Sequence, residues 1–396
     1  MPSIRKSRRR LALAATALAA ALAVTATACG PDDTGTDAKP DSAASAEAGK
    51  DGGDRDLSLP KDLPTSLKDL EKWKNGGWDN WEEKDWLREA ADFINPVIED
   101  LWDHDRMKKA EDNEKAVPAD VKTAASGTDP EPPRVRAQSV PTPYTRNAAP
   151  SGKIFMDTPK GPMVCSGTVV KDPRNPGKSN LVATAGHCVH SGKSGGWLRN
   201  IMFIPAYNNQ GKSPDQLNHA PAREIAPYGR YWAEWAQTST HWIEQGADRG
   251  GAGAQQDFAV LKVKPMDNQG KSLEQTVGAA VKINFNAPQI DRISGVRAYG
   301  YPAAPPYNGA LMQNCASRPG RLTMDPSQPA MYRYGCSMTG GSSGGPVIMS
   351  GAGGKAELIS VNSIGPDTAA WLAGPRLGPT AQGVFDAISK KYAGKS

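Results

Sequence analysis

The sequence is poor in the residue types and patterns that mark several large classes of function. Its 396 residues include only five histidines and five cysteines, and these do not recur at the spacing of a metal site. No phosphate-binding glycine loop and no nucleic-acid-binding module can be recognised, and the charged residues, 22% of the chain, are scattered. These absences predict a protein that uses no metal or other cofactor and binds no nucleic acid.

Long apolar runs are also lacking, except near the N-terminus. Five basic side chains within residues 1–10 precede an 18-residue run rich in alanine and leucine, Leu11–Ala28. A charged start, an apolar middle and small residues at the end are typical of a secretory signal. Cys29 follows, and the segment resembles a bacterial lipoprotein signal. It predicts export, removal of the signal peptide at residues 1–28, and a lipid anchor on Cys29 that holds the protein on the outer face of the cytoplasmic membrane. Free secretion with one unpaired thiol is the alternative.

Three regions of different composition follow the signal. Residues 29–58 are rich in Asp, Ala, Gly and Ser and are predicted to be a disordered tether. Residues 59–112 hold five of the ten tryptophans, and apolar side chains recur at helical spacing from Leu87 to Trp102, which predicts a Trp-rich helical segment. Residues 113–150 contain seven prolines and are predicted to be a linker.

The last 246 residues, Ser151–Ser396, have the pattern of an all-β domain. Short apolar segments recur between turn residues, and Ala381–Tyr392 carries apolar side chains at helical spacing, with Thr380 as its expected N-cap. The apolar segments are 163–170, 201–204, 257–263, 281–285, 296–299, 347–349 and 358–361. This pattern predicts a β-barrel or sandwich followed by a C-terminal helix, in a domain large enough for a sizeable core.

Glycines surround one serine in this domain. The run Gly340–Pro346 predicts a tight turn that presents the Ser343 hydroxyl and directs several backbone N–H groups at one point. A serine nucleophile needs such a nest, and it needs a neutral imidazole to accept its proton and later return it to the leaving amine. His187 ends the motif TAGH after the apolar stretch at 181–183, and it is the natural base.

The two segments together, TAGHC at 184–188 and GSSGGP at 341–346, resemble the paired signatures of the chymotrypsin-like (trypsin-like) serine peptidases. Residues 338–340 are similar to the bacterial secreted branch of that family. The resemblance covers residues 151–396. It implies two six-stranded antiparallel β-barrels with a C-terminal helix, and a serine endopeptidase that hydrolyses peptide bonds through an acyl-enzyme on Ser343.

An aspartate is expected to orient the histidine and to stabilise the imidazolium. Six aspartates lie between His187 and Ser343, and Asp257 opens an alternating strand, DFAVLKV, which would hold its carboxylate on a rigid element. The family also places its acid at the start of such a strand. Asp248, in a glycine-rich loop, is the reserve candidate.

The resemblance implies further roles. The oxyanion would be held by the N–H groups of Gly341 and Ser343, and the substrate pocket would be lined by Ser337, Asn362 and Ser363. No aspartate stands at Ser337, so a preference for Lys or Arg is not expected, and a neutral or small-polar pocket is predicted.

The residue before the nucleophile and the cysteines add to the resemblance. Ser342 stands where many members carry an aspartate that pairs with a newly cleaved N-terminus, so activation by that ion pair is not expected. The family pairs cysteines in the settings of Cys165 and Cys188, which leaves Cys315 and Cys336 to pair. Two disulfides indicate an oxidising compartment.

Charge separates the catalytic domain from the segment before it. Residues 59–112 contain 9 basic and 15 acidic residues, a net charge of −6, whereas residues 151–396 contain 25 and 15, a net charge of +10. Opposite charges suggest that residues 59–112 dock on the domain as a pro-segment or lid. A helical stalk is the alternative.

For the whole protein, the alternative to an endopeptidase of protein or peptide substrates is a catalytically inactive protease-fold binding protein of the cell envelope.

Overall fold

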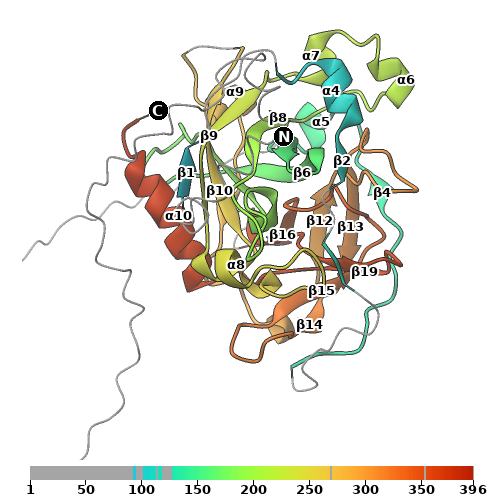
Figure 1. Ribbon diagram of the computed structural model, residues 1–396, viewed down its shortest axis with the longest axis vertical. Coiled ribbons are helices and arrows are strands. Elements are labelled where there is room, and N and C mark those ends of the chain that lie inside the picture. Colours follow the sequence, from blue (N-terminus) through green and yellow to red (C-terminus); the bar gives the residue numbers. More distant parts are fainter. Residues whose placement is uncertain are drawn as a thin grey trace, which may run out of the picture. The chain divides into compact units, whose positions relative to one another are not determined.

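The computed structural model describes a mostly β protein with helices on its outside (Figure 1). The predicted signal peptide, Cys29 and the tether at 29–58 lie outside the described residues, as does most of the predicted Trp-rich segment. The description covers the backbone of residues 92–94, and residues 101–112, 115–117, 127–267, 270–351 and 354–395. Among these residues, none of the helices combines the length and apolar character that a membrane crossing needs.

Six antiparallel strands close into a barrel in the first half of the domain. Their spatial order is β9, β10, β7, β6, β5 and β8, and pairing of β8 with β9 closes the ring. The strands are β5 Ser151–Thr158, β6 Gly161–Val170, β7 Leu181–Thr184, β8 Arg199–Pro205, β9 Tyr231–Thr238 and β10 Ala259–Pro265. The closed ring of paired strands makes this half a rigid support for the residues at its rim.

The second half contains a six-stranded and a three-stranded sheet. The larger sheet has the order β11, β17, β16, β12, β13 and β4, and the smaller has the order β14, β15 and β19. Their bounds are β4 Gln138–Ser139, β11 Lys282–Ile283, β12 Val296–Gly300, β13 Gln313–Ser317, β14 Gly320–Leu322, β15 Met331–Gly335, β16 Pro346–Ser350, β17 Ala356–Val361 and β19 Trp371–Gly374. Strand β11 runs parallel to β17, a departure from the all-antiparallel pairing that the resemblance implied.

One apolar cluster runs through both halves and the C-terminal helix. It includes Val260 of β10, Val347 of β16 and Ile388 of the helix, none of which has any exposed surface. The predicted all-β, chymotrypsin-like architecture with a C-terminal helix is confirmed.

Helix α10, Pro379–Lys391, packs on β9 and β10. It begins one residue before the predicted cap, because Pro379 fits the first helical position and Gly378 stands at the N-cap. Val384, Phe385 and Ile388 are buried, as their spacing predicted. Two lysines in the last turn interact favourably with the carbonyl end of the helix dipole.

The helix predicted over residues 87–102 is wrong where the structure describes it. Asp92–Ile94 form strand β1, antiparallel to residues 235–237 of β9. Strand β8 pairs with β9 only at Tyr231 and Trp232, which leaves the edge at 235–237 for β1 to cover. Pairing with this open edge satisfies backbone N–H and C=O groups. The helical spacing of the apolar residues gives no information about such a long-range pairing.

Shorter elements complete the described chain. Helix α4 is capped by Asp103, whose side chain accepts a hydrogen bond from Arg106 N. The remaining bounds are α4 His104–Lys109, β2 Glu111–Asp112, β3 Ala116–Val117, α5 Tyr144–Asn147, α6 Pro214–Leu217, α7 Ala222–Ile225, α8 Thr240–Gln245, α9 Leu273–Val277 and β18 Gly365–Pro366.

Much of the proline-rich range predicted as a linker packs on both halves of the domain. Gln138–Ser139 form β4, which pairs with β13. Asp129 receives a bidentate hydrogen bond from the Arg321 guanidinium, which lowers the pKa of that carboxyl. Tyr144 is 1% exposed in a second apolar cluster. The prolines here stiffen an extended chain segment, which lies on the surface of the domain and covers it.

Candidate active site

His187 lies at the rim of the closed barrel, directly after β7. It is the middle residue of a short 3-10 turn, Gly186–Cys188, and the following Cys188 is disulfide-bonded to Cys165 of β6, as predicted. Gly186 is required here, because a Cβ at this position would approach Asp257 Oδ1 to 2.9 Å and the Trp242 ring to 2.9 Å. The turn and the disulfide together fix the position of the imidazole.

Asp257 is the carboxylate that contacts this histidine. Its Oδ2 lies 2.7 Å from His187 Nδ1, and its Oδ1 accepts a 2.8 Å hydrogen bond from the His187 backbone N–H. Both side chains are fully buried. The residue stands two positions before β10 and not at its first residue, at the end of the 3-10 turn Ala254–Gln256.

Asp248, the reserve candidate, is placed elsewhere. Its side chain is 53% exposed, and it forms ion pairs with Lys115 at 2.8 Å and Lys160 at 3.9 Å. Partial burial opposes ionisation of this carboxyl, but the bonded Lys115 ammonium lowers its pKa below the ordinary value. The histidine is therefore oriented by Asp257, and Asp248 holds a lysine from the N-terminal part of the chain.

The glycine run forms the expected tight turn around Ser343. Gly341 and Gly344 have φ of +91° and +76°, a backbone conformation that favours glycine. A Cβ on Gly344 would come within 2.0 Å of Thr184 Oγ1 and 2.9 Å of Ala185 N, so the turn is pressed against the end of β7. This close approach brings the segment that carries Ser343 to the segment that carries His187.

Ser166 of β6 ties the turn to the first barrel. Its backbone N–H donates to the Ser343 carbonyl at 2.7 Å, and its hydroxyl donates to the Gly341 carbonyl at 2.9 Å. The Gly340 carbonyl accepts a hydrogen bond from Ala303 N. Three carbonyls of the turn are thus held by three hydrogen bonds from outside it.

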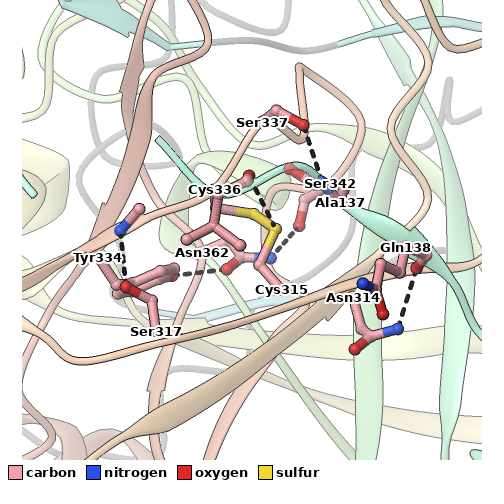
Figure 2. The surroundings of a disulfide bond; sticks show 12 residues. Ala137, Gln138, Asn314, Cys315, Ser317, Tyr334, Cys336, Ser337, Ser342 and Asn362 are labelled. Atoms are coloured by element: carbon pink, nitrogen blue, oxygen red, sulfur yellow. Dashed lines mark hydrogen bonds between the residues drawn. A yellow bond between two sulfur atoms is a disulfide. The ribbon is translucent and has the colours of Figure 1, made fainter. Parts of the chain in front are cut away.

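Neutral groups support the turn at Ser342, the position at which no ion pair with a cleaved N-terminus was expected. The Ser342 hydroxyl donates to the Thr339 carbonyl at 2.8 Å, and Asn362 Nδ2 donates to the Ser342 carbonyl at 2.9 Å. The Asn362 Oδ1 accepts a 2.6 Å hydrogen bond from the buried Tyr334 hydroxyl. Figure 2 shows Asn362 between Ser342 and Tyr334, beside the predicted Cys315–Cys336 disulfide. Asn362, predicted as a pocket residue, has its polar atoms directed at the protein.

Ser363 was also predicted to line the substrate pocket, but its side chain points to the acid. Its hydroxyl donates to Asp257 Oδ2 at 2.5 Å, so it positions the carboxylate that holds His187. Sequence reasoning expected a strand here, but β17 ends at Val361 and Ser363 follows it. The role was missed because Asp257 lies 106 residues away in the sequence.

Ser337, the predicted specificity position, lies beside the N-terminal extension of the domain. Its hydroxyl accepts a 2.9 Å hydrogen bond from Ala137 N (Figure 2). The same hydroxyl contacts the Tyr307 hydroxyl at 3.0 Å. The side chain is 5% exposed, and no carboxylate is bonded to it among the described residues.

Cys165, His187 and Cys188 are close enough together to suggest a metal site. Both sulfurs are joined in the disulfide, and a cysteine binds metal as a thiolate. The grouping therefore does not fit a metal.

Comparisons with known proteins assign the family. No family model matches the chain, and no curated protein matches it. Among solved structures, the thermostable serine protease AL20 from an extremophilic microorganism is 32% identical over 61% of this chain and 98% of its own, with a TM-score of 0.49.

Two further solved structures resemble the chain. The protease Anisep from Arthrobacter nicotinovorans is 30% identical over 64% of this chain and 99% of its own, with a TM-score of 0.49. A Glu endopeptidase is 16% identical, with a TM-score of 0.44, and covers 66% of this chain and 99% of its own. The assignment rests on the identity to AL20 and Anisep across almost their whole lengths: the chain belongs to the chymotrypsin-like serine peptidases.

Proposed function

We propose that this protein is a serine endopeptidase in which Ser343 is the nucleophile, His187 the general base and acid, and Asp257 the orienting carboxylate. One observation carries the proposal: a fully buried carboxylate bonds both the backbone N–H and the Nδ1 of the histidine, at the point where the glycine turn meets β7. The alternative of an inactive binding protein gives no chemical reason for this arrangement.

The bond to Asp257 decides the protonation of the histidine. With the Nδ1 proton held by the carboxylate, Nε2 is left as the acceptor for the Ser343 proton. The serine oxygen attacks the peptide carbonyl, the imidazolium returns the proton to the leaving amine, and water then hydrolyses the acyl-enzyme with the same histidine as base. Asp257 stabilises the imidazolium throughout and keeps its own charge.

The N–H groups of Gly341 and Ser343 are the proposed oxyanion donors. The positive φ of Gly341 and the bond from Ser166 to its carbonyl fix the orientation of this part of the turn before substrate arrives. Donors that are fixed in advance need no rearrangement as negative charge develops on the carbonyl oxygen.

The proposed substrates are proteins or peptides with a neutral or small side chain before the scissile bond. Ser337 supplies no negative charge for a Lys or Arg side chain, and its hydroxyl is already bonded to Ala137 N and the Tyr307 hydroxyl. A mixed peptide library cleaved by the protein tests this preference, and cleavage mainly after Lys or Arg would contradict it.

The proposed location is the cell envelope, outside the cytoplasm. The two disulfides favour an oxidising compartment, and the Cys29 motif suggests a lipid anchor. Incorporation of radiolabelled fatty acid should be lost in Cys29→Ala, and a wild-type protein without label would instead be freely secreted.

A serine-directed phosphonate tests the proposed chemistry. Wild-type protein should be labelled and Ser343→Ala should not, with Ser294→Ala, at an exposed serine, as the matched control that keeps the nucleophile. Each protein is tested intact and after limited proteolysis, so that a covered site is not mistaken for an inactive one. Absence of label in both wild-type samples, or equal labelling of Ser343→Ala, would overturn the proposal.

A further inference from the structure

A short segment from before the catalytic domain is paired with the strand edge beside the active site. Strand β3, Ala116–Val117, runs parallel to β18, Gly365–Pro366, with Ala116 opposite Gly365. The pairing begins two residues after Ser363, whose hydroxyl is bonded to Asp257. We call Lys115–Val117 the strap.

The strap closes the space next to the nucleophile. Lys115 lines a cavity of about 10 Å³ together with Gly340, Ser342, Ser343 and Ser363. This volume is no larger than about 10 to 15 Å³, the space that one ordered water needs. His187 has no exposed surface and Ser343 is 6% exposed. A substrate side chain has no room to enter while the strap is in place.

Three kinds of contact hold the strap. Lys115 Nζ forms a 2.8 Å ion pair with Asp248, and the Lys115 side chain is only 8% exposed. The Ala116 carbonyl accepts a hydrogen bond from Gly250 N. Val117 is 1% exposed in an apolar cluster with Ile364 and Trp371 of the second half.

The chain is also fixed to the first barrel before the strap. Trp102 is 1% exposed, and its indole Nε1 donates to the Asn200 carbonyl at 2.6 Å. Arg106 forms a 2.6 Å ion pair with Asp157, and β2 pairs with β6. After the strap, Asp129 is bonded to Arg321 of the second half. The strap is therefore held between anchors on both halves.

A peptide whose carbonyl reaches Ser343 must pass the same edge, because Ser343 and Gly365 line one cavity. Extended peptides bind such an edge through their backbone groups, and this edge is already paired with Ala116–Val117. Peptide and strap compete for the same backbone groups and the same space.

We propose that Lys115–Val117 is an autoinhibitory strap, which occupies the substrate-binding edge at Gly365–Pro366 and keeps the full-length protein in a closed state. The proposal rests on the proposed peptidase function. It differs from docking of the whole 59–112 region, because the inhibitory contact comes from the range that the sequence predicted to be a linker.

Variants of the full-length chain test the strap. Val117→Asp introduces a carboxylate into the apolar cluster, and Lys115→Ala removes the ion pair to Asp248. We expect kcat/KM for a peptide and the phosphonate labelling rate to rise more than about tenfold in Val117→Asp and about fivefold in Lys115→Ala, since weakening the closed state raises the competent fraction. Lys160→Ala is the matched control, because Lys160 also faces Asp248 but is 75% exposed and lies outside the strap.

The outcomes separate the strap from the peptidase function. Faster labelling in both strap variants, with Lys160→Ala at the wild-type rate, supports the strap. If the wild type is active and both strap variants react at the same rate as the wild type, the strap proposal is overturned and the peptidase proposal stands. If no variant reacts at Ser343, before or after limited proteolysis, both proposals fail. Should Val117→Asp not fold, as judged by thermal unfolding, Lys115→Ala decides the test alone.

Discussion

The two halves of the catalytic domain support their functional residues by different means. The first half is a closed barrel that holds His187 and Asp257 at its rim, stiffened by a disulfide next to the histidine. The second half carries Ser343 on a turn that depends on hydrogen bonds from Ser166, Ala303 and Asn362. The comparison teaches that the proposed acid and base are fixed by strand closure, whereas the proposed nucleophile is fixed by a neutral network. Damage to either half should therefore have distinct signatures.

The largest effect is expected at the acid of the first half. Asp257→Asn retains the shape of the side chain but presents an amide to His187 Nδ1, which favours the wrong tautomer. We expect kcat to fall about 10⁴-fold with little change in the fold, as is typical when an isosteric amide replaces this carboxylate. Kinetics on a peptide substrate, with Asp267→Asn as the exposed control, measure it. A fall of less than tenfold would show that another group orients the histidine.

The network of the second half should lose both activity and stability when Asn362 is truncated. Asn362→Ala leaves the Tyr334 hydroxyl buried without its acceptor and removes one of the two donors to the Ser342 carbonyl, the other being Gly345 N. We expect kcat to fall about 10- to 100-fold and the free energy of unfolding to fall by about 2 kcal/mol.

A neighbouring residue separates these two effects. Ser363→Ala should lower kcat through Asp257 while leaving stability within about 1 kcal/mol of the wild type. The exposed Asn286 supplies the control Asn286→Ala. Equal stability losses for Asn362→Ala and Ser363→Ala would remove the distinction drawn between the two residues.

Loss of either disulfide should lower the free energy of unfolding by a similar amount, but the two losses should differ in their effect on activity. They span sequence separations of 23 and 21 residues, so loss of either should cost about 2 to 4 kcal/mol of unfolding free energy. Only the Cys165→Ser/Cys188→Ser double variant should also lower kcat strongly, because Cys188 is bonded next to the histidine. Chemical unfolding and kinetics of both double variants, at a temperature where each is folded, make the comparison. A larger kcat loss in Cys315→Ser/Cys336→Ser would reverse the expected order.

The smallest effect concerns a buried cation in each half. Burial lowers the pKa of Lys153 in the first barrel to about 7, while Arg333 in the second half is also shifted downward by burial. An unfolded lysine keeps its proton up to its ordinary value of 10.5, so between pH 7 and that value the unfolded chain binds more protons. Stability should therefore rise with pH, by about 2 kcal/mol from pH 7 to 9.

Two variants in the Ser343→Ala background, which prevents self-digestion, test this pH dependence. Lys153→Met should flatten the rise, and Lys271→Met, at an exposed position, should retain it. Urea unfolding at several pH values provides the measurement. A wild-type profile that stays flat would show that the ammonium of Lys153 is better compensated than its surroundings indicate.

The sequence predicted site residues that stand in local motifs better than those whose role depends on partners far away in the sequence. His187 and Ser343 stand in short motifs whose chemistry is local, so the sequence indicated both. Asp257 was found because few aspartates precede an alternating strand. Ser363 and Asn362 were expected on a strand but follow the end of β17, and their hydrogen-bond partners lie far away in sequence, at Asp257 and Ser342.

The N-terminal region was harder to predict, because long-range pairing decides its structure. Asp92–Ile94 form a strand by pairing with an edge of β9, and no local sequence pattern predicts this pairing. Lys115 lies in a stretch without motif or periodicity, and its position follows only from Asp248 and the edge at Gly365. Proline content suggested a linker at residues 113–150, although prolines suit an extended chain that is bonded to the domain every few residues as well as one that is free.

The neutral support of Ser342 has a consequence for how the proposed peptidase can be regulated. A turn held by a hydroxyl and an amide needs no newly formed terminus and no protonation event to acquire its shape. Its geometry should persist across salt concentration and pH, because neither partner carries a charge. Regulation of the proposed peptidase is then expected to act on access and not on assembly: the turn has its shape beforehand, and what changes is whether a peptide can reach it.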